Sequence, residues 1–212
     1  MEEFLLPPAV LYPIIDTAVC ARLGRDPLDL GRAVLRAGVR LLQLRVKAEE
    51  DARFLERAEA LAREAHARGA RLVVNDRADV ARLAGADGVH VGQTDLPVEA
   101  VRRILEGEAI VGLSTHDRAQ VDAALAGAAT YIAVGPIFAT GTKETGCEPQ
   151  GLDLVRYAAG RGKPVAAIGG ITLDRAPATL AAGASCLAVI GDLAAAADPE
   201  ARARAYLTAV PS

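Results

Sequence analysis

One phrase recurs along this chain: a segment rich in Ala, Arg, Leu and Glu, then usually a Gly, then four to six apolar residues rich in Val and Ile. The Gly suits a helix C-terminus, where left-handed backbone is needed, and the apolar run suits a strand buried on both faces. With a first run at residues 10–15, the runs lie at 38–45, 69–75, 85–91, 108–114, 127–134, 162–168 and 183–190. We therefore predict eight strands.

Helical segments are expected between these strands, at residues 28–37, 49–67, 77–84, 97–106, 117–126, 151–160, 173–182 and 198–209. Strict alternation of strand and helix implies parallel strands with right-handed crossovers. The predicted fold class is α/β, a (β/α)₈ barrel, and the predicted domain is single and spans residues 1–212. An open doubly wound sheet is the structural alternative, but no G-x-G-x-x-G follows the first strand.

The composition narrows the range of partners. A net charge of -3 gives no basic field, and 3% aromatic residues give no stacking platform, so a nucleic-acid partner is not expected. Acidic residues at the N-terminus and the lack of a long apolar run predict a soluble, cytoplasmic protein with no membrane partner. The scattered Cys20, Cys147 and Cys186 suggest neither a disulfide framework nor a zinc site.

Barrels of this class place their chemistry where the strands end. After the second strand, Gln43, Arg45 and Lys47 alternate with apolar residues, so all three are expected to point inward at the barrel mouth. With no acid apparent beside them, a buried Arg and Lys would require an anionic ligand such as a diphosphate. The alternative is a structural salt bridge inside the barrel.

Carboxylates follow the next two strands. Asn75 and Asp76 end the third strand, and His90 and Asp95 accompany the fourth. Two carboxylates on adjacent strands suit Mg²⁺, which takes one or two carboxylates plus water and phosphate oxygens. Alternatively, Asn75-Asp76 and Asp95 could cap the helices that follow, and His90 could be a hydrogen-bonded core residue.

A polar loop follows the sixth strand and contains Thr140, Gly141, Thr142 and Lys143. Hydroxyls, backbone N–H groups and a point charge together can hold phosphate, although the same residues could form an ordinary surface loop. Gly170 and Gly191 end the last two strands, where barrels commonly bind a phosphate. The pattern predicts two phosphate zones and therefore two phosphorylated substrates.

These residues together resemble the thiamine-phosphate synthase family over nearly the whole chain and in the family's order. The matching segments are Gln43-x-Arg45-x-Lys47, Asn75-Asp76-Arg77, and residues 85–97, 135–143 and 167–171. The resemblance implies a Mg²⁺-dependent transferase that joins hydroxymethylpyrimidine diphosphate to a thiazole phosphate and releases thiamine phosphate and pyrophosphate.

The resemblance also implies a role for each matching residue. It assigns catalysis to Arg45, Lys47, Ser114 and Lys143, with Ser114 near the leaving group. It implies that Gln43 binds the pyrimidine with His90 nearby, and that Asp76 and Asp95 bind Mg²⁺. It also implies two phosphate-binding sets. The diphosphate is bound by Arg45, Lys47, Asn75 and Lys143, and the thiazole phosphate is bound by Thr140, Thr142, Gly170, Ile190 and Gly191.

Two other functions are open to a chain of this kind. A thiazole tautomerase related to the synthase shares the barrel and uses a His in the loop after the sixth strand, where this chain reads Gly135-Pro136. A non-catalytic barrel that binds a phosphorylated ligand is the second, and the full set of cations and acids argues against it.

Overall fold

The computed structural model describes residues 10–47, 49–141 and 148–209, and these form a closed barrel of eight parallel strands in sequence order. The strands are β1 (Leu11–Asp16), β2 (Leu41–Arg45), β3 (Arg71–Asn75), β4 (Gly88–Val91), β5 (Ile110–Thr115), β6 (Tyr131–Val134), β7 (Val165–Ile168) and β8 (Cys186–Val189). Closure is made by β1, which pairs with both β2 and β8. The predicted (β/α)₈ barrel is confirmed.

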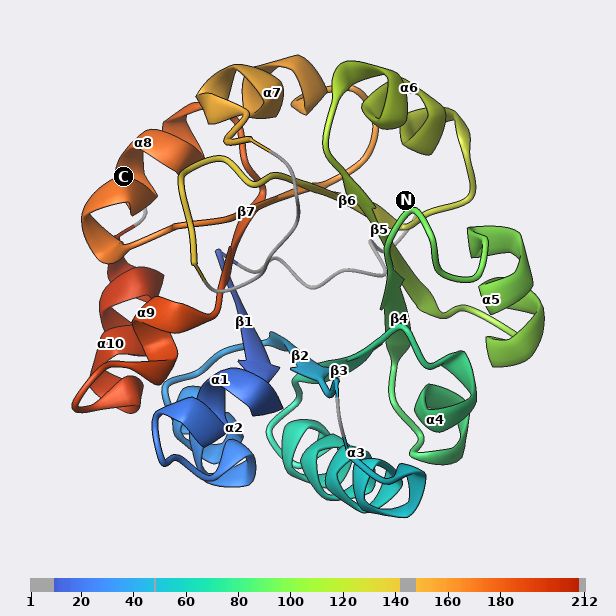
Figure 1. Cartoon of the computed structure of the whole chain (residues 1–212), viewed down its shortest axis with the longest axis vertical. Helices are drawn as coiled ribbons and strands as arrows, with labels where there is room; N and C mark the ends of the chain where they lie inside the picture. The colour runs from blue at the N-terminus through green and yellow to red at the C-terminus, as the bar shows by residue number, and fades with distance from the viewer. Residues whose placement is uncertain (1–9, 48, 142–147, 210–212) are drawn as a thin grey trace.

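Helices surround the strands as an outer ring (Figure 1). The predicted helices are present as α2 (Pro27–Arg36), α3 (Asp51–His66), α4 (Ala78–Leu83), α5 (Val98–Leu105), α6 (Arg118–Ala126), α7 (Gly151–Ala158), η1 (Leu173–Arg175) with α8 (Ala176–Ala181), and α10 (Pro199–Thr208). Two short helices were not predicted, namely α1 (Thr17–Arg22) and α9 (Gly191–Ala194). Neither is long enough to show an apolar period.

The predicted glycine role holds at most of the helix ends. Gly38 and Gly183 have φ values of +100° and +101°, which only glycine adopts easily. Gly127 is an exception, because its backbone is extended with φ at −84°. The general rule therefore predicts the helix ends correctly, but not the backbone of every one.

The core has two layers because strand side chains alternate between faces. A large layer between strands and helices contains Leu42 and Leu44, whereas a smaller layer inside the barrel contains Leu41, Tyr12 and Tyr131. Gln43 lies two residues from Leu41, so it shares the interior face. The inward direction predicted for the polar residues of β2 is thereby confirmed.

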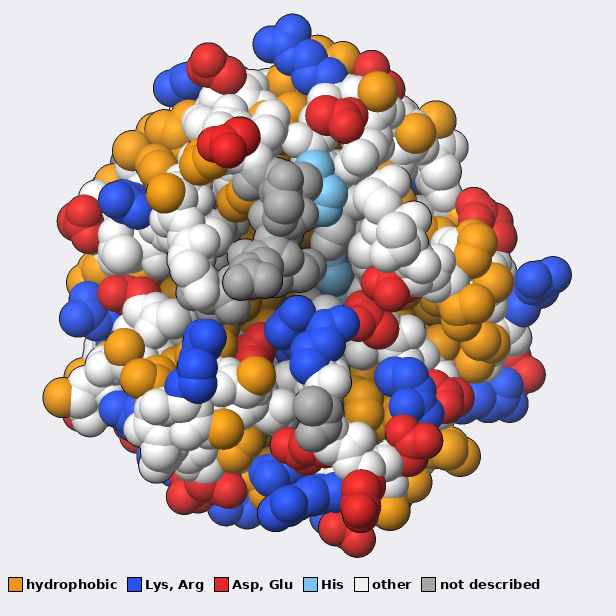
Figure 2. All heavy atoms as spheres, viewed as in Figure 1, with side chains coloured by type: hydrophobic (Ala, Val, Ile, Leu, Met, Phe, Trp, Pro, Cys, Tyr) orange, Lys and Arg blue, Asp and Glu red, His pale blue; other side chains and the backbone are white. Residues whose placement is uncertain are grey.

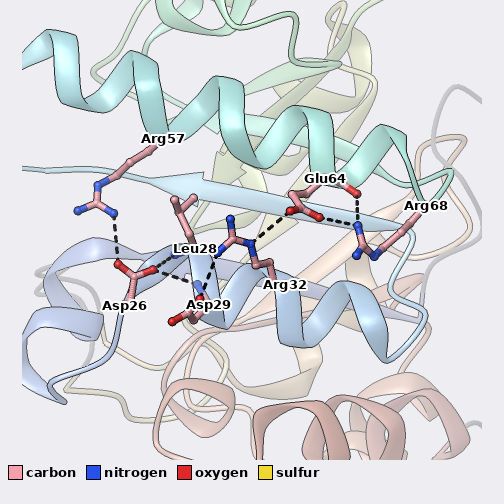
Figure 3. A network of polar contacts seen from close by, with 7 residues as sticks. All are labelled: Asp26, Leu28, Asp29, Arg32, Arg57, Glu64 and Arg68. Atoms are coloured by element: carbon pink, nitrogen blue, oxygen red, sulfur yellow. Dashed lines mark hydrogen bonds and ion pairs between the residues drawn. The ribbon is translucent and has the colours of Figure 1, made fainter.

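The helical shell is linked on its outside by exposed ion pairs. Arg32 of α2 contacts Asp29 of its own helix at 3.2 Å and Glu64 of α3 at 3.3 Å, and Glu64 also accepts from Arg68 (Figure 3). Exposed pairs of this kind each contribute little to stability, about 0–1 kcal/mol. The barrel is therefore stabilised mainly by its buried apolar layers.

Candidate active site

The C-terminal ends of the eight strands form one rim, and the predicted site residues that the structure describes lie on it. Gln43 and Arg45 belong to β2, Asn75 to β3, His90 to β4 and Ser114 to β5; Lys47, Asp76, Asp95, Thr140, Gly170, Ile190 and Gly191 follow β2, β3, β4, β6, β7 and β8. Thr142 and Lys143 lie outside the described residues.

Arg45 has an acidic partner that the sequence analysis missed. Asp16 ends β1 directly opposite Arg45 in the strand register, and its Oδ2 forms an ion pair with Arg45 Nη1. The carboxylate is 2% exposed and the Arg45 side chain 13%. The prediction that Arg45 lacks a nearby acid is therefore wrong, because Arg45 forms an ion pair with Asp16 at this end of the barrel.

Lys47 is likewise paired, but near the surface. Its Nζ donates to Asp76 Oδ2 at 2.6 Å, and its side chain is 45% exposed, so the prediction of a buried lysine is wrong. Burial raises the pKa of Asp76, the nearby Asp95 raises it further through a shared hydrogen bond, and Lys47 lowers it. Lys47, Asp76 and Asp95 thus form one connected group after β2, β3 and β4.

Neither acid of this group caps a helix. The N-cap positions of α4 and α5 are Arg77 and Pro97, and neither makes a side-chain cap. Asp95 Oδ2 instead accepts from the backbone N–H of Gly92 at 2.8 Å. The capping alternative is thus wrong for Asp76 and Asp95, and both carboxylates are held on the rim by other contacts.

A chain of hydrogen bonds crosses the barrel beneath this group. His90 is 8% exposed, and its ring nitrogens contact Tyr131 Oη at 2.8 Å and Ser114 Oγ at 2.9 Å. Gln43 Nε2 donates to Tyr12 Oη at 2.8 Å, and Tyr12 Oη contacts Tyr131 Oη at 2.8 Å. The interpretation of His90 as a hydrogen-bonded core residue is confirmed.

A cavity of about 240 Å³ opens on the other half of the rim. It is lined from β5 to β8 by Ser114, His116, Gly135, Pro136, Thr140, Ile168, Gly169, Gly170, Ile171, Thr172, Ala188, Val189, Ile190, Gly191 and Asp192. The loop after β6 is fastened to the end of β7, because Ile137 and Phe138 donate their N–H groups to the carbonyls of Ile168 and Gly169.

Gly170 shapes one wall of this cavity. Its φ is +61°, and an added Cβ would lie 2.5 Å from the carbonyl oxygen of Ala139. Only glycine therefore allows the loop after β6 to approach the end of β7 so closely. Thr140, which follows in that loop, is brought to the cavity by the same approach.

Asp192 places an acid beside the cavity, but α10 holds its carboxylate. Its Oδ2 accepts from Tyr206 Oη at 2.7 Å, and Arg202 lies 3.8 Å away. The negative charge is thereby partly compensated. Ile190 and Gly191 form the adjoining wall where β8 ends and α9 begins.

Figure 2 shows basic, acidic and histidine side chains close together near the centre of the viewed face. Among the described residues, no group of three or more His, Cys, Asp and Glu side chains is arranged as a complete metal site. No helix among them is both long and apolar enough to cross a membrane.

Tyr12, Asp16 and Tyr131 are among the site residues that were not identified from sequence. Asp16 carried a usable signal, since it is a polar residue at the end of a strand, like those that were identified. The tyrosines lie deeper and carry no such signal. His116 Nδ1 contacts the carbonyl of Gly135 at 2.6 Å and lines the cavity.

Comparison with known proteins agrees with this arrangement. A family model described as thiamine monophosphate synthase matches residues 11–193. Thiamine-phosphate synthase of Mycobacterium bovis is 45% identical, with 99% of each chain aligned, and that of Arthrobacter sp. is 42% identical over 99% of this chain and 97% of the relative.

A solved structure, thiamine phosphate pyrophosphorylase from Pyrococcus furiosus, superposes with a TM-score of 0.86 at 28% identity and covers 95% of both chains. The predicted family and the predicted transferase activity are confirmed by these matches. Since both the family model and the curated relatives extend through nearly the whole barrel, the chain belongs to the thiamine monophosphate synthase family.

Proposed function

We propose that the protein performs the family's transfer at this rim, with Mg²⁺ between Asp76 and Asp95 and with a diphosphate and a monophosphate held on opposite halves. The observation that carries the proposal is the connected group of Lys47, Asp76 and Asp95 on three successive strand ends. The cavity beside it supplies room for a second substrate.

The donor set fits a magnesium ion. Asp76 and Asp95 are close enough to share a hydrogen bond, and their mutual repulsion contributes to the raised pKa of Asp76. A divalent cation between them would remove that repulsion. Two carboxylates suffice, because Mg²⁺ usually keeps several waters and takes phosphate oxygens as further ligands. When bound, it would neutralise charge on the departing diphosphate.

The chain's own cations support the same step. Arg45, fixed by Asp16, keeps guanidinium N–H groups beyond the one in the ion pair, and these can donate to diphosphate oxygens. Lys47 can turn toward the ligand at little cost because its side chain is half exposed. Asn75 and Lys143 complete the proposed diphosphate set, with Lys143 outside the described residues. Fixed positive charge of this kind stabilises a leaving group as its bond breaks.

On this proposal the pyrimidine ring lies over Gln43 and His90, and Ser114 lies close to the leaving group. The carbon–oxygen bond to the diphosphate breaks, the electron-rich ring carries the developing positive charge, and the thiazole nitrogen then attacks the exposed carbon. This step needs no side-chain nucleophile. The chain binds the two reactants and orients them.

The thiazole phosphate is assigned to the cavity between β6 and β8. Thr140, Gly170, Ile190 and Gly191 line it, and Asp192 is drawn toward Tyr206 rather than left without a partner. Thr142, also assigned to this phosphate, lies outside the described residues. Holding both reactants by separate phosphate anchors can lower the barrier by about 7–11 kcal/mol.

Three further points belong to the same proposal. Residues 1–212 form one domain, the partners are small phosphorylated molecules rather than nucleic acid, and the protein works in the cytoplasm. The net charge of -3 supports the second point. Cys20 and Cys186 are free and buried, as expected in a reducing compartment.

The test is to incubate the pure protein with both substrates and Mg²⁺ and to measure thiamine phosphate by mass spectrometry. Asp76→Asn and Asp95→Asn should lose most of the rate. Asp79→Asn is the matched control, because Asp79 pairs with Arg77 outside this group. No product from the wild-type protein would refute the function. An undiminished rate of thiamine phosphate formation in EDTA would refute the metal.

A further inference from the structure

The hydrogen bonds inside the barrel link side chains from five strands. In order they join Gln43 of β2, Tyr12 of β1, Tyr131 of β6, His90 of β4 and Ser114 of β5, with separations of 2.8 to 2.9 Å. The two end residues are those proposed to meet the pyrimidine and the leaving group. The two tyrosines between them have no assigned role.

The interior is built around this chain. An added Cβ on Gly112 of β5 would lie 2.2 Å from Tyr131 Cζ and 2.4 Å from His90 Nδ1, so only glycine leaves space for these two rings. The Tyr12 and Tyr131 rings meet edge to face, with centroids 5.9 Å apart. Packing therefore fixes the oxygens and nitrogens at hydrogen-bond distance.

The positions of the protons follow from counting donors. Burial raises the pKa of Tyr12 and of Tyr131, so each phenol keeps its single proton. Gln43 Nε2 donates to Tyr12, so the Tyr12 proton goes to its other partner, Tyr131. The Tyr131 proton must then go to His90 Nδ1.

The same count of donors and acceptors assigns the protons of His90 and Ser114 at the other end of the chain of hydrogen bonds. With Nδ1 acting as acceptor, a neutral His90 carries its proton on Nε2 and donates to Ser114 Oγ. The Ser114 hydroxyl hydrogen is then left to donate elsewhere, and Ser114 lines the cavity. At the opposite end, Gln43 uses its amide N–H on Tyr12 and offers its carbonyl oxygen as an acceptor.

We propose that Tyr12 and Tyr131 are positioning residues that orient Gln43 as a hydrogen-bond acceptor and Ser114 as a donor at the two ends of one ordered chain. The ligand groups that these two ends would contact depend on the proposed function. The amino group of the pyrimidine would donate to Gln43, and the departing diphosphate would accept from Ser114. Reversal at one end would require reversal of every bond between, so the order of the chain sets the role of each end.

The direct test reads the proton on His90 in the ligand-free, full-length protein. The chain has three histidines, so ¹⁵N-histidine labelling gives three ring spectra, and His90→Gln identifies the relevant one. We expect His90 to carry its proton on Nε2, with Nδ1 unprotonated. A proton on Nδ1 would overturn the proposal. Because no substrate is present, this result is independent of whether the enzymatic function is correct.

Two variants test the direction of the chain. Tyr131→Phe removes the donor to Nδ1 and should change the His90 spectrum, whereas Tyr12→Phe leaves that donor in place and should preserve it. The reverse direction predicts that both variants disturb His90, and that result would refute the proposal.

The kinetic effects should also separate. Tyr131→Phe is expected to lower kcat roughly ten-fold through Ser114, and Tyr12→Phe to raise KM for the pyrimidine diphosphate by a similar factor through Gln43, each the effect of about one hydrogen bond. KM for the thiazole phosphate should stay within two-fold in both, as an estimate on the same scale. Equal losses in all parameters would indicate a merely structural role and would contradict the inference.

Discussion

Replacing Asp16 with asparagine tests how the barrel holds its buried cation. The Asp16 carboxylate is 2% exposed and pairs with Arg45, whose side chain is 13% exposed. Its Oδ1 also accepts from the N–H of Val19 at 2.9 Å and so caps α1. Asparagine keeps an oxygen for the cap, removes the charge and places an NH₂ group, which cannot accept from Arg45, where Oδ2 stood. Because the guanidinium is left buried without a counter-charge, we expect the free energy of unfolding to fall by about 3–5 kcal/mol.

A matched control exists on the next helix. Asp26 caps α2 through the N–H groups of Leu28 and Asp29, and it pairs with Arg57 at 3.9 Å while its side chain is 51% exposed (Figure 3). Asp26→Asn makes the same chemical change at the same kind of cap. Water screens this pair, so its loss should cost about 0–1 kcal/mol. The difference between the losses of unfolding free energy in the two variants therefore measures the effect of burying the ion pair.

Urea unfolding followed by circular dichroism gives both free energies by linear extrapolation. Arg45→Met and the variant that carries both substitutions complete a double-mutant cycle. The double variant should lose less free energy of unfolding than the two single losses added together, by about 0.5–3 kcal/mol. An Asp16→Asn protein whose stability lies within about 1 kcal/mol of Asp26→Asn would refute the reasoning, because the pair would then behave as an exposed one.

Other expected outcomes follow from single contacts. Gly170→Ala should raise KM for the thiazole phosphate and lower stability by about 1–3 kcal/mol more than Gly24→Ala, which has a similar φ of +62° but no atom near the added carbon. Burial raises the pKa of Cys20 to about 11 and of Cys186 to about 12, so both should resist alkylation at pH 8 in the native protein and react when it is unfolded, as peptide mass mapping would show. The pKa of Asp76 lies above its ordinary 3.8, so the metal-free folded protein binds a proton there more tightly than the unfolded chain does. Its free energy of unfolding should therefore fall as pH rises from 3.8 through the raised pKa. The affinity for Mg²⁺, measured by calorimetry, should fall as pH is lowered through the same range, because protons compete with the metal.

The alternation of polar and apolar residues predicted which way side chains point, but not which residues they contact. Alternation along β2 correctly placed Gln43 and Arg45 on the interior face, because side-chain direction depends only on local backbone geometry. The partner of Arg45 depends on strand register, which sets Asp16 opposite it across the β1–β2 pair. Register is fixed by barrel closure and not by any local pattern, so the ion pair could not be predicted.

The buried tyrosines were missed for a related reason. Tyr12 and Tyr131 appear in the sequence as ordinary members of apolar strands, and their hydroxyls meet only because both side chains point into the interior of the closed barrel. The role of Gly112 could not be predicted from the sequence either, because the space that requires glycine there is filled by the Tyr131 ring of the neighbouring strand. Residues at strand ends were identifiable because the fold class alone tells where they lie.

The two cations on β2 and after it have different partners, and this difference has a consequence for binding. Asp16 and Arg45 are buried together, so separating them is costly and Arg45 should keep its partner throughout the reaction. The Lys47–Asp76 pair is half exposed and costs little to break. We therefore expect Lys47 to leave Asp76 for the diphosphate while Asp76 turns to the metal. A crystal structure with pyrophosphate and Mg²⁺ in which Lys47 still bonds Asp76 would contradict this exchange.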